Sequence, residues 1–332
     1  MSREIATAES GRPVVKLEEV VKHFPLRRSG LSREHRVVHA VDGVSLHMNT
    51  GETLGIVGES GCGKSTLGRL TAGLMKPTSG TVHLCDESDE SEQGKASAAP
   101  VQMVFQDPAT SLDPRMTIGK SVAEPLTGTA RQDKRERVRE LLDLVGLAQE
   151  YADVFPHELS GGQQQRACIA RALIAEPRLI VHDESLSSLD VSLQAQIINL
   201  LLDLQQSYGV SYCFISHDLR AVRAVSTQVA VMYLGQVVEL APVDSFKNEL
   251  LHPYAVLLRA AEPIADMAAG RRSTQRVVLG GEPSSAVDPP PACRFAPRCP
   301  IARDVCRSEA PPLIELRPGH WAACHFAGEF EA

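Results

Sequence analysis

The stretch that decides the fold is Gly58-Glu59-Ser60-Gly61-Cys62-Gly63-Lys64-Ser65, which directly follows the short apolar run Leu54–Val57. It has the spacing G-x-x-x-x-G-K-S/T, with which a glycine-rich loop between a strand and a helix wraps around phosphate groups. Glycines permit the positive φ angles that turn successive N–H groups toward an anion, and the helix N-terminus adds its dipole. We expect Lys64 to reach the β- and γ-phosphates of a nucleotide, Ser65 to bind Mg²⁺, and Thr66 to complete the site.

Predicted strands alternate with predicted helices around this loop. The strands are expected at 14–21, 37–47, 54–57, 179–181 and 210–215, and the helices from Lys64, over 130–146 and over 193–206. The first two strands are joined by a basic loop that contains Arg27, Arg28, Arg33 and Arg36. The acidic stretch Cys85–Pro100 is poor in apolar residues and is expected to be a flexible surface excursion. The alternation predicts an α/β domain with a mainly parallel sheet.

Composition limits the kinds of partner. The chain has 332 residues, of which 43% are hydrophobic and 4% aromatic, and its net charge is −7. The acidic balance argues against nucleic acid as a partner. No apolar run is long enough to span a membrane, and the first thirteen residues do not resemble a secretory signal. We therefore expect a cytosolic location, so that in any transport process other chains would form the pore.

Two carboxylates follow the apolar run Leu179–Val181, after His182. Asp183 at the end of such a strand can hold Mg²⁺, and Glu184 is placed to polarise an attacking water molecule. Paired acids at a strand end can also cap a turn, but their position downstream of a phosphate-binding loop favours the catalytic interpretation.

The pentapeptide Leu159-Ser160-Gly161-Gly162-Gln163 precedes a helix predicted to begin near Gln164. Alone it could be a simple helix N-cap. Followed by Gln-Gln-Arg, and combined with the loop and the carboxylates, it resembles the signature sequence of ABC ATPases. The resemblance implies a P-loop NTPase fold with a RecA-like core, an antiparallel β subdomain and a helical subdomain. It also implies a head-to-tail dimer, in which the partner's γ-phosphate is bound by Ser160, Gly161, Gly162 and Gln163.

Four further residues resemble elements of the same family. Gln106 matches the glutamine that senses Mg²⁺ and the attacking water, and His217 matches the histidine that contacts the γ-phosphate. Asp190, in Ser-Ser-Leu-Asp, matches the loop that crosses the dimer interface, and Phe24 matches the aromatic residue that stacks on adenine. A histidine or phenylalanine after a strand can instead be purely structural. The resemblance thus implies Glu184, His217 and Gln106 as catalytic residues.

Two positions near these motifs depart from the family pattern, and a cysteine lies within the phosphate loop. Ser185 stands where the family usually carries Pro, and His182 where a small apolar residue is usual, so we expect activity with an altered loop stiffness. Cys62 lies near a helix N-terminus, which can lower a thiol pKa, but a passive loop position is the favoured interpretation.

The C-terminal part resembles that of dipeptide/oligopeptide importer ATPases. The matching segments are His252-Pro253-Tyr254, Gly281–Ser284, Pro290–Phe295 and Arg298-Cys299-Pro300. We predict an ATP-binding domain at 14–250 and a loop-rich extension with four cysteines at 251–332. The resemblance implies ATP-driven peptide import from the cytoplasmic face of the membrane. The implied partners are a second ATPase chain, forming a heterodimer, two transmembrane permease subunits and an extracytoplasmic binding protein.

Four of the eight cysteines crowd into the last forty residues. Cys293, Cys299, Cys306 and Cys324 have the spacing C-x5-C-x6-C-x17-C, and four thiolates can hold zinc or a 4Fe–4S cluster. The tight pair usual in zinc sites is missing, and members of the importer family carry a 4Fe–4S cluster on a similar cysteine set. That cluster is the favoured hypothesis over zinc and over uncommitted thiols.

Other functions remain open at this stage. A non-transport scaffold ATPase of a phosphonate-degrading complex shares the nucleotide motifs, and an importer could carry a metal chelate or a sugar. A DNA-repair ATPase would need a long insertion between Lys64 and Ser160, for which there is no room. An inactive interaction subunit disagrees with the intact set Lys64, Asp183, Glu184 and His217.

Overall fold

The computed structural model of the chain describes residues 13–26, 36–84, 100–126, 130–261 and 285–331. Three expectations therefore lie outside the described residues. They are the loop arginines Arg27, Arg28 and Arg33, the acidic excursion apart from Pro100, and the segment Gly281–Ser284.

The largest element is an eight-stranded sheet of order β10-β11-β9-β8-β3-β7-β6-β5. Strands β8, β3, β7, β6 and β5 pair in parallel, and β9, β11 and β10 add antiparallel strands at one edge. The strand bounds are Ile314–Arg317 (β10), His320–Ala322 (β11), Gln236–Pro242 (β9), Gln228–Tyr233 (β8), Thr53–Val57 (β3), Ser211–Ile215 (β7), Leu179–Asp183 (β6) and Val101–Val104 (β5). Every residue of β3, β6 and β7 is buried, as their continuous apolar runs predict for strands covered on both faces.

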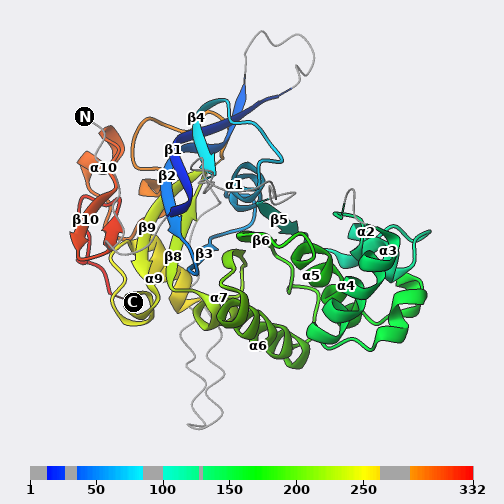
Figure 1. Cartoon of the computed structure of the whole chain (residues 1–332). Helices are drawn as coiled ribbons and strands as arrows, with labels where there is room; N and C mark the ends of the chain where they lie inside the picture. Colours follow the sequence, from blue (N-terminus) through cyan, green and yellow to red (C-terminus); the bar gives the residue numbers. More distant parts are fainter. Residues whose placement is uncertain (1–12, 27–35, 85–99, 127–129, 262–284, 332) are drawn as a thin grey trace, which may run out of the picture.

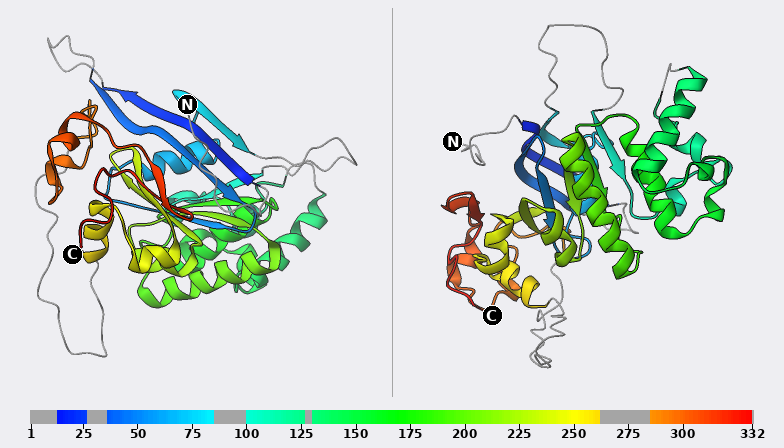
Figure 2. Two further views of the ribbon diagram at one scale, coloured as in Figure 1. Left: turned by 90° about the vertical axis from the view of Figure 1, so that its left-hand side faces the viewer. Right: turned by 60° about the horizontal axis from the view of Figure 1, so that its bottom comes forward.

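A second, three-stranded antiparallel sheet of order β2-β1-β4 covers one face of the molecule. Its strands are Val37–Asn49 (β2), Pro13–Pro25 (β1) and Ser79–Leu84 (β4). Helix α1 (Lys64–Thr71) lies between the two sheets, as Figure 2 shows on its left. Its buried Leu67 and Leu70 join a core built from both sheets, which includes Val15 and Val44 from the small sheet and Ile56 from the large one. This core fixes the helix that follows the phosphate-binding loop.

The opposite face of the large sheet carries helices α6 (Val191–Tyr208) and α7 (Leu219–Val225). A separate group of helices projects beyond the β5 edge, on the right of Figure 1. The group consists of α2 (Pro108–Ser111), α3 (Ile118–Val122), α4 (Arg131–Leu144), the 3-10 turns η1 (Gln149–Asp153) and η2 (Pro156–Glu158), and α5 (Gly161–Leu173). The predicted face Val138, Leu141, Leu142 and Val145 is buried within it. The small sheet, the central sheet and this helical part match the three subdomains expected for the family.

The C-terminal residues are less loop-like than their proline content indicates. They add α8 (Val243–Asn248), α9 (Pro253–Ala260), the turn η3 (Ala296–Arg298), α10 (Asp304–Ser308) and the hairpin β10–β11. Trp321 of β11 pairs with Leu240 of β9, so this region extends the central sheet. It lies at the end of the molecule opposite the helical part, as Figures 1 and 2 both show. The boundary after residue 250 therefore remains a prediction, within a body that is continuous across it.

Two predicted boundaries differ from the structure by more than two residues. Strand β1 runs on to Pro25, four residues past its predicted end. Helix α5 begins at Gly161, three residues before the expected start near Gln164. The reason is a capping box: the Ser160 side chain accepts a hydrogen bond from Gln163 N, and the Gln163 side chain accepts one from Ser160 N. These reciprocal bonds satisfy two N–H groups and draw both glycines into the first helical turn.

Within the described ranges, no helix combines the length and the apolar character needed to cross a bilayer.

The pH dependence of stability should depend on His252, the fully buried N-cap of α9. Burial lowers the pKa of His252 from 6.5 to about 3, and its Nδ1 accepts a hydrogen bond from Tyr254 N, so the neutral ring is the folded form. Below pH 6.5 the unfolded chain binds a proton that the folded chain rejects, and stability is lost as the pH falls. His252→Asn keeps a capping side chain without this titration.

Urea unfolding at pH 7, 6 and 5 measures the effect. Between pH 6 and pH 5 the native protein should lose about 1.2 kcal/mol more stability than His252→Asn. The control His157→Leu, at an exposed position, should keep the native slope. Equal slopes for the native protein and His252→Asn would contradict the assignment.

Candidate functional site

The phosphate-binding loop leaves the end of β3 and enters α1. Gly58 and Gly63 have φ angles of 151° and 109°, in the region that favours glycine. A Cβ atom on Gly63 would lie 1.9 Å from the carbonyl oxygen of Ala40 in β2. The loop is thus pressed against the small sheet, and the spacing of glycines in the motif reflects both backbone angle and close approach.

Lys64 folds back over its own loop. Its side chain is buried, and Nζ donates to the carbonyl oxygens of Gly58 at 2.8 Å and Glu59 at 3.0 Å. These bonds hold the loop curved around the ammonium group. Phosphate oxygens can replace the carbonyl acceptors, because a lysine ammonium is a compact charge on a flexible stem.

Ser65 and Asp183 are brought together from α1 and β6. The Ser65 hydroxyl donates to Asp183 Oδ1 at 2.7 Å. Burial raises the pKa of the Asp183 carboxyl, while the hydrogen bond from Ser65 and the charges of Arg69 and Lys64 oppose that rise. A buried carboxylate beside a hydroxyl is an oxygen donor set of the kind that Mg²⁺ uses together with nucleotide phosphates. The structure thus brings together two of the residues that the sequence predicts to hold Mg²⁺.

Glu184 and His217 meet at the same sheet edge, because β6 and β7 are parallel neighbours. Their Oε2 and Nδ1 atoms are 3.6 Å apart. Glu184 has a positive φ of 49°, and its N–H donates to Ile215 O at 2.9 Å. This hydrogen bond holds the end of β6 against the end of β7. The carboxylate is half-buried and His217 is exposed, so both can face a ligand held by the loop.

The two departures from the family pattern contact one another. His182 is fully buried, and its Nδ1 lies 3.2 Å from the hydroxyl oxygen of Ser185, which is also buried. The hydrogen bond spans Asp183 and Glu184 and links the strand to the turn that follows. Burial lowers the pKa of His182 to about 3, so the ring is neutral and can pack its edge against Tyr212. The two departures thus form one side-chain bridge across the carboxylates; the expected change in loop stiffness stays a prediction.

The structure places Gln106 and Phe24 at the margins of this group. Gln106 lies two residues beyond β5, the parallel neighbour of β6, and it is exposed. Phe24 lies near the end of β1, opposite Val38, with 37% of its surface exposed. The Lys22 ammonium is 5.4 Å from the centre of the Phe24 ring. An exposed ring on a strand end is free to stack on a planar ligand, which a core phenylalanine is not.

The signature residues lie apart from their own chain's phosphate loop. Ser160, Gly161, Gly162 and Gln163 open α5 in the helical part, and Ser160 and Gly161 are exposed. A Cβ atom on Gly162 would be 3.2 Å from Leu193, so α5 packs closely on α6. The side chain of Asp190 accepts from Leu193 N and caps α6 beside this contact. Among the hydrogen bonds of the described residues, none joins the signature to residues 58–65.

Two contacts to the phosphate loop come from Tyr254 and Arg298, which the sequence marked only as part of the C-terminal resemblance and not as site residues. The N–H of Glu59 donates to the hydroxyl oxygen of Tyr254 at 2.8 Å. The Glu59 carboxylate receives two hydrogen bonds from Arg298, each 2.8 Å long. These partners are 195 and 239 residues from Glu59 along the chain. No periodicity or spacing could have revealed them.

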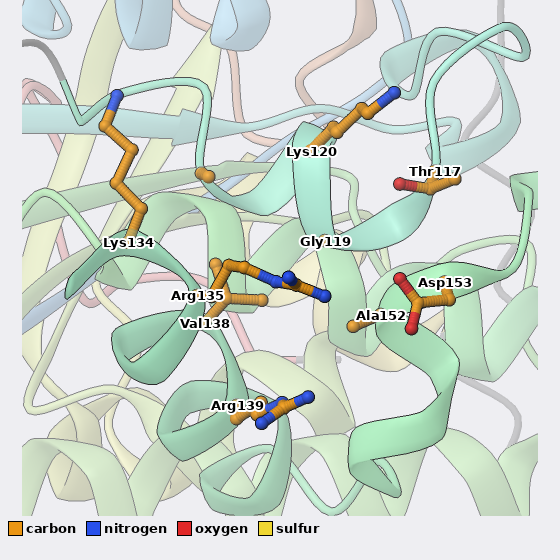
Figure 3. A pocket seen from close by; sticks show the side chains of 10 residues that line it. Thr117, Gly119, Lys120, Lys134, Arg135, Val138, Arg139, Ala152 and Asp153 are labelled. Carbon is orange, nitrogen blue, oxygen red and sulfur yellow. The ribbon is translucent and has the colours of Figure 1, made fainter. Parts of the chain in front are cut away.

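A separate hollow of about 270 Å³ lies in the helical part (Figure 3). Arg135 and Arg139 approach it from α4, and Asp153 lies on the other side, in η1. None of the predicted site residues lines it. The predicted nucleotide-site residues described above lie instead at the edge of the parallel sheet.

Two family models match separate parts of the chain. The model described as "ABC transporter" matches residues 41–187, which contain the phosphate loop, the signature and both carboxylates. The model described as "Oligopeptide/dipeptide transporter, C-terminal region" matches residues 238–306, which contain Tyr254 and Arg298.

Several curated proteins are similar over nearly their whole length. The "Probable peptide ABC transporter ATP-binding protein y4tS" of Sinorhizobium fredii is 47% identical, with 94% of this chain and 89% of that protein covered. The "Oligopeptide transport ATP-binding protein AppF" of Bacillus subtilis is 45% identical, with 96% and 99% covered. The "Oligopeptide transport ATP-binding protein OppF" of Escherichia coli is 43% identical, with 96% and 98% covered.

The fold also matches solved structures. A post-hydrolysis dimer of the ATP-binding cassette MJ0796, bound to ADP and Pi, aligns with a TM-score of 0.57 at 29% identity. The alignment covers 69% of this chain and 98% of that one. A second dimeric structure of MJ0796, described as a bacterial ABC transporter cassette, aligns with a TM-score of 0.57 at 27% identity.

Removal of the Ser185 hydroxyl should destabilise the protein. Ser185→Ala leaves the buried Nδ1 of His182 without its partner, and Nε2 already lacks one among the described residues. The free energy of unfolding should fall by about 1–3 kcal/mol. The control Ser188→Ala, at an exposed position nearby, should change it by less than about 0.5 kcal/mol.

A second background isolates the hydrogen bond. In a His182→Val protein, adding Ser185→Ala should cost less than about 0.5 kcal/mol, because the partner is already absent. An equal cost in both backgrounds, measured by urea unfolding, would show that the bridge does not stabilise the fold.

Proposed function

The chain belongs to the ATP-binding subunits of ABC transporters, and on that premise we propose that it hydrolyses ATP to drive import of dipeptides or oligopeptides across the cytoplasmic membrane. The single structural observation that supports this best is the edge of the parallel sheet. There Lys64, the Ser65–Asp183 pair and the Glu184–His217 pair lie together around a loop shaped for phosphates.

Within one chain, different residues bind the phosphates, hold Mg²⁺ and activate the water molecule. Lys64 and the loop N–H groups bind the β- and γ-phosphates, and the exposed Phe24 ring stacks on adenine. Ser65, Asp183 and Gln106 would hold Mg²⁺, which neutralises charge on the phosphates. Glu184 polarises the attacking water, and His217, 3.6 Å from it, contacts the γ-phosphate. The bridge between His182 and Ser185 keeps the strand end that bears both carboxylates in place.

The second half of each site comes from another ATPase chain. The signature Ser160–Gln163 and Asp190 lie outside the chain's own phosphate loop and largely face solvent. A helix N-terminus with exposed N–H groups binds an anion well, so a partner's γ-phosphate can occupy it. The solved dimers of the similar MJ0796 cassette support such an assembly. We propose a heterodimer of two ATPase chains that closes around ATP and opens after hydrolysis.

Transport needs further subunits. The described helices include none that could span a membrane, so two transmembrane permease subunits would form the pathway, and an extracytoplasmic protein would deliver the substrate. The ATPase would then sit at the cytoplasmic face, held through the permeases. Peptide cargo is supported by the printed names of the similar proteins and by the C-terminal family model at residues 238–306.

The sulfurs of the four C-terminal cysteines lie too far apart to hold a single zinc ion together. Burial raises the pKa of the Cys324 thiol to about 11, and Cys293, Cys299 and Cys306 lie near enough to add to the rise. A cation bound between the four sulfurs would stabilise the thiolate forms and so lower these thiol pKa values. Zinc bound at about 2.3 Å from each sulfur would hold the sulfurs about 3.8 Å apart. No three of these sulfurs, all of them among the described residues, lie within 4.8 Å of one another.

A 4Fe–4S cluster spreads its four cysteine ligands further apart than one metal ion does, because each cysteine binds a different iron. We propose that this cluster joins the two ends of the extension, residues 293–306 and Cys324. Its contribution is structural: it would stabilise a region of short elements that has little core of its own.

The assigned role of Glu184 predicts a separation of binding from turnover. Glu184→Gln should bind ATP about as tightly as the native protein, because the γ-phosphate contacts remain. Phosphate release should fall about a thousandfold, since the group that polarises water is lost. In cells without the native gene, the variant should fail to restore uptake of a radiolabelled tripeptide.

Control and alternatives follow from the same assay. Glu150→Gln, an exposed glutamate in η1, should behave as the native protein. Native turnover in Glu184→Gln would refute its catalytic role. Tripeptide uptake that does not require the native gene would remove the peptide assignment. Loss of metal-chelate uptake in the same cells would then indicate a different cargo, and no loss of any uptake would favour a scaffold ATPase.

The cluster is tested by metal and sulfide analysis of protein purified without air. We expect about four irons and four acid-labile sulfides per chain, and loss of both in Cys306→Ser. Cys168→Ala, a buried cysteine of α5 outside the group, serves as the control and should keep them. Zinc without sulfide, or neither metal, would reject the cluster.

A further inference from the structure

Glu59 is held from three directions, although it is a variable position of the phosphate loop motif. Its carbonyl oxygen accepts from Lys64 Nζ at 3.0 Å. Its N–H donates to Tyr254 on α9, and its carboxylate binds Arg298 through two bonds of 2.8 Å. Two of the three partners therefore belong to the C-terminal region.

The Arg298 contact is strong by its geometry. The guanidinium binds both carboxylate oxygens at once, which is the bidentate arrangement that fixes orientation as well as distance. The Arg298 side chain is only 4% exposed, whereas Glu59 is 27% exposed. The ring of Tyr233 lies beside the guanidinium, with 6.0 Å between the Arg298 Cζ and the ring centre. A buried charge of this kind is costly unless its partner stays in place.

The segment that carries Arg298 has a second attachment. It runs from Cys293 to Cys299, and Arg294 within it donates to Leu234 O and to the carboxylate of Asp42. Asp42 also bonds His23, the neighbour of Phe24. Between the two arginines, Phe295 packs on Tyr233 and Tyr254 with ring centres 5.3 Å and 5.4 Å away. The segment Cys293–Cys299 thus contacts the nucleotide surface near both the adenine-stacking residue and the phosphate loop.

Glu59 raises an electrostatic problem for an ATP site. Its carboxylate is part of a loop that must receive a triphosphate, and like charges in a partly buried site repel each other strongly. A bidentate guanidinium cancels that charge and keeps the carboxylate on the side of the C-terminal segment.

We propose that Arg298 is a positioning residue for ATP: the C-terminal segment Cys293–Cys299 completes the phosphate loop by neutralising and orienting Glu59. This rests on the proposed ATP site and deepens it, because the extension then contributes directly to nucleotide binding.

Three variants test the pairing by titration with methylanthraniloyl-ATP, a fluorescent ATP analogue. Arg298→Ala exposes the bare Glu59 carboxylate and should raise the Kd about tenfold, with KM for ATP rising more than kcat falls. Adding Glu59→Gln removes the carboxylate charge and should bring the Kd back to within about threefold of native. Arg317→Ala, which breaks the exposed ion pair with Glu249 in the same region, should leave the Kd unchanged.

The thermal midpoint of the nucleotide-free variants separates positioning from folding. A merely structural Arg298 would lower the midpoint in Arg298→Ala and would not be rescued by Glu59→Gln. If Arg298→Ala does not fold, Arg298→Lys can replace it. Lysine keeps the positive charge but not the two-pronged guanidinium, and should raise the Kd about threefold. A Kd within twofold of native in the folded variant, or no rescue in the double variant, overturns the proposal. Failure of the native protein itself to bind the analogue would instead refute the proposed ATP site.

Discussion

Parallel pairing of β3, β7 and β6 is the constraint on which the rest of the site depends. Because these strands point the same way, the phosphate loop, His217 and the two carboxylates all emerge at one sheet edge. Backbone bonds tie the strand ends together: Glu184 N donates to Ile215 O, and Ser216 N donates to Ile56 O. The short Ser65–Asp183 hydrogen bond is possible only because α1 starts above β3 while β6 ends two strands away.

The helical part and the C-terminal region act on this edge from opposite ends of the molecule (Figures 1 and 2). The helical part carries the signature at the start of α5, away from its own phosphate loop. The C-terminal region reaches the loop of its own chain through Tyr254 and Arg298. In the assembly proposed above, half of the site comes from a second chain. Another part lies between two regions of one chain that are far apart in sequence.

The departures at His182 and Ser185 show how a local change can be balanced. A histidine in a fully buried strand would leave both ring nitrogens without partners, which is unfavourable in an apolar core. A serine three residues later supplies one partner and closes a bridge across the carboxylates. Each residue alone would be a defect, and together they form a contact that spans the groups proposed for catalysis.

The sequence alone determined the elements whose signal is local. Glycine spacing, buried apolar runs and helix periodicity predicted β3, β6, β7, α1, α4 and α6, and the order of motifs predicted which side chains would gather around the phosphates. Those patterns depend on neighbours within a few residues, so they survive without knowledge of the chain path. The capping-box spacing of Ser160 and Gln163 is visible in the sequence, but the two glycines between them disfavour helix, so the predicted start of α5 lies three residues too late.

Only the tertiary structure decided what happens between distant segments. The C-terminal hairpin joins the central sheet at β9, and Arg298 meets Glu59 across 239 positions. Composition described that region as a loop-rich appendage, because prolines mark turns and say nothing about what the turns pack against. The sequence of the phosphate loop predicted the fold, but its own eight residues determine only part of the loop's contacts. Its Glu59 takes its orientation and its neutral surroundings from a guanidinium near the other end of the chain.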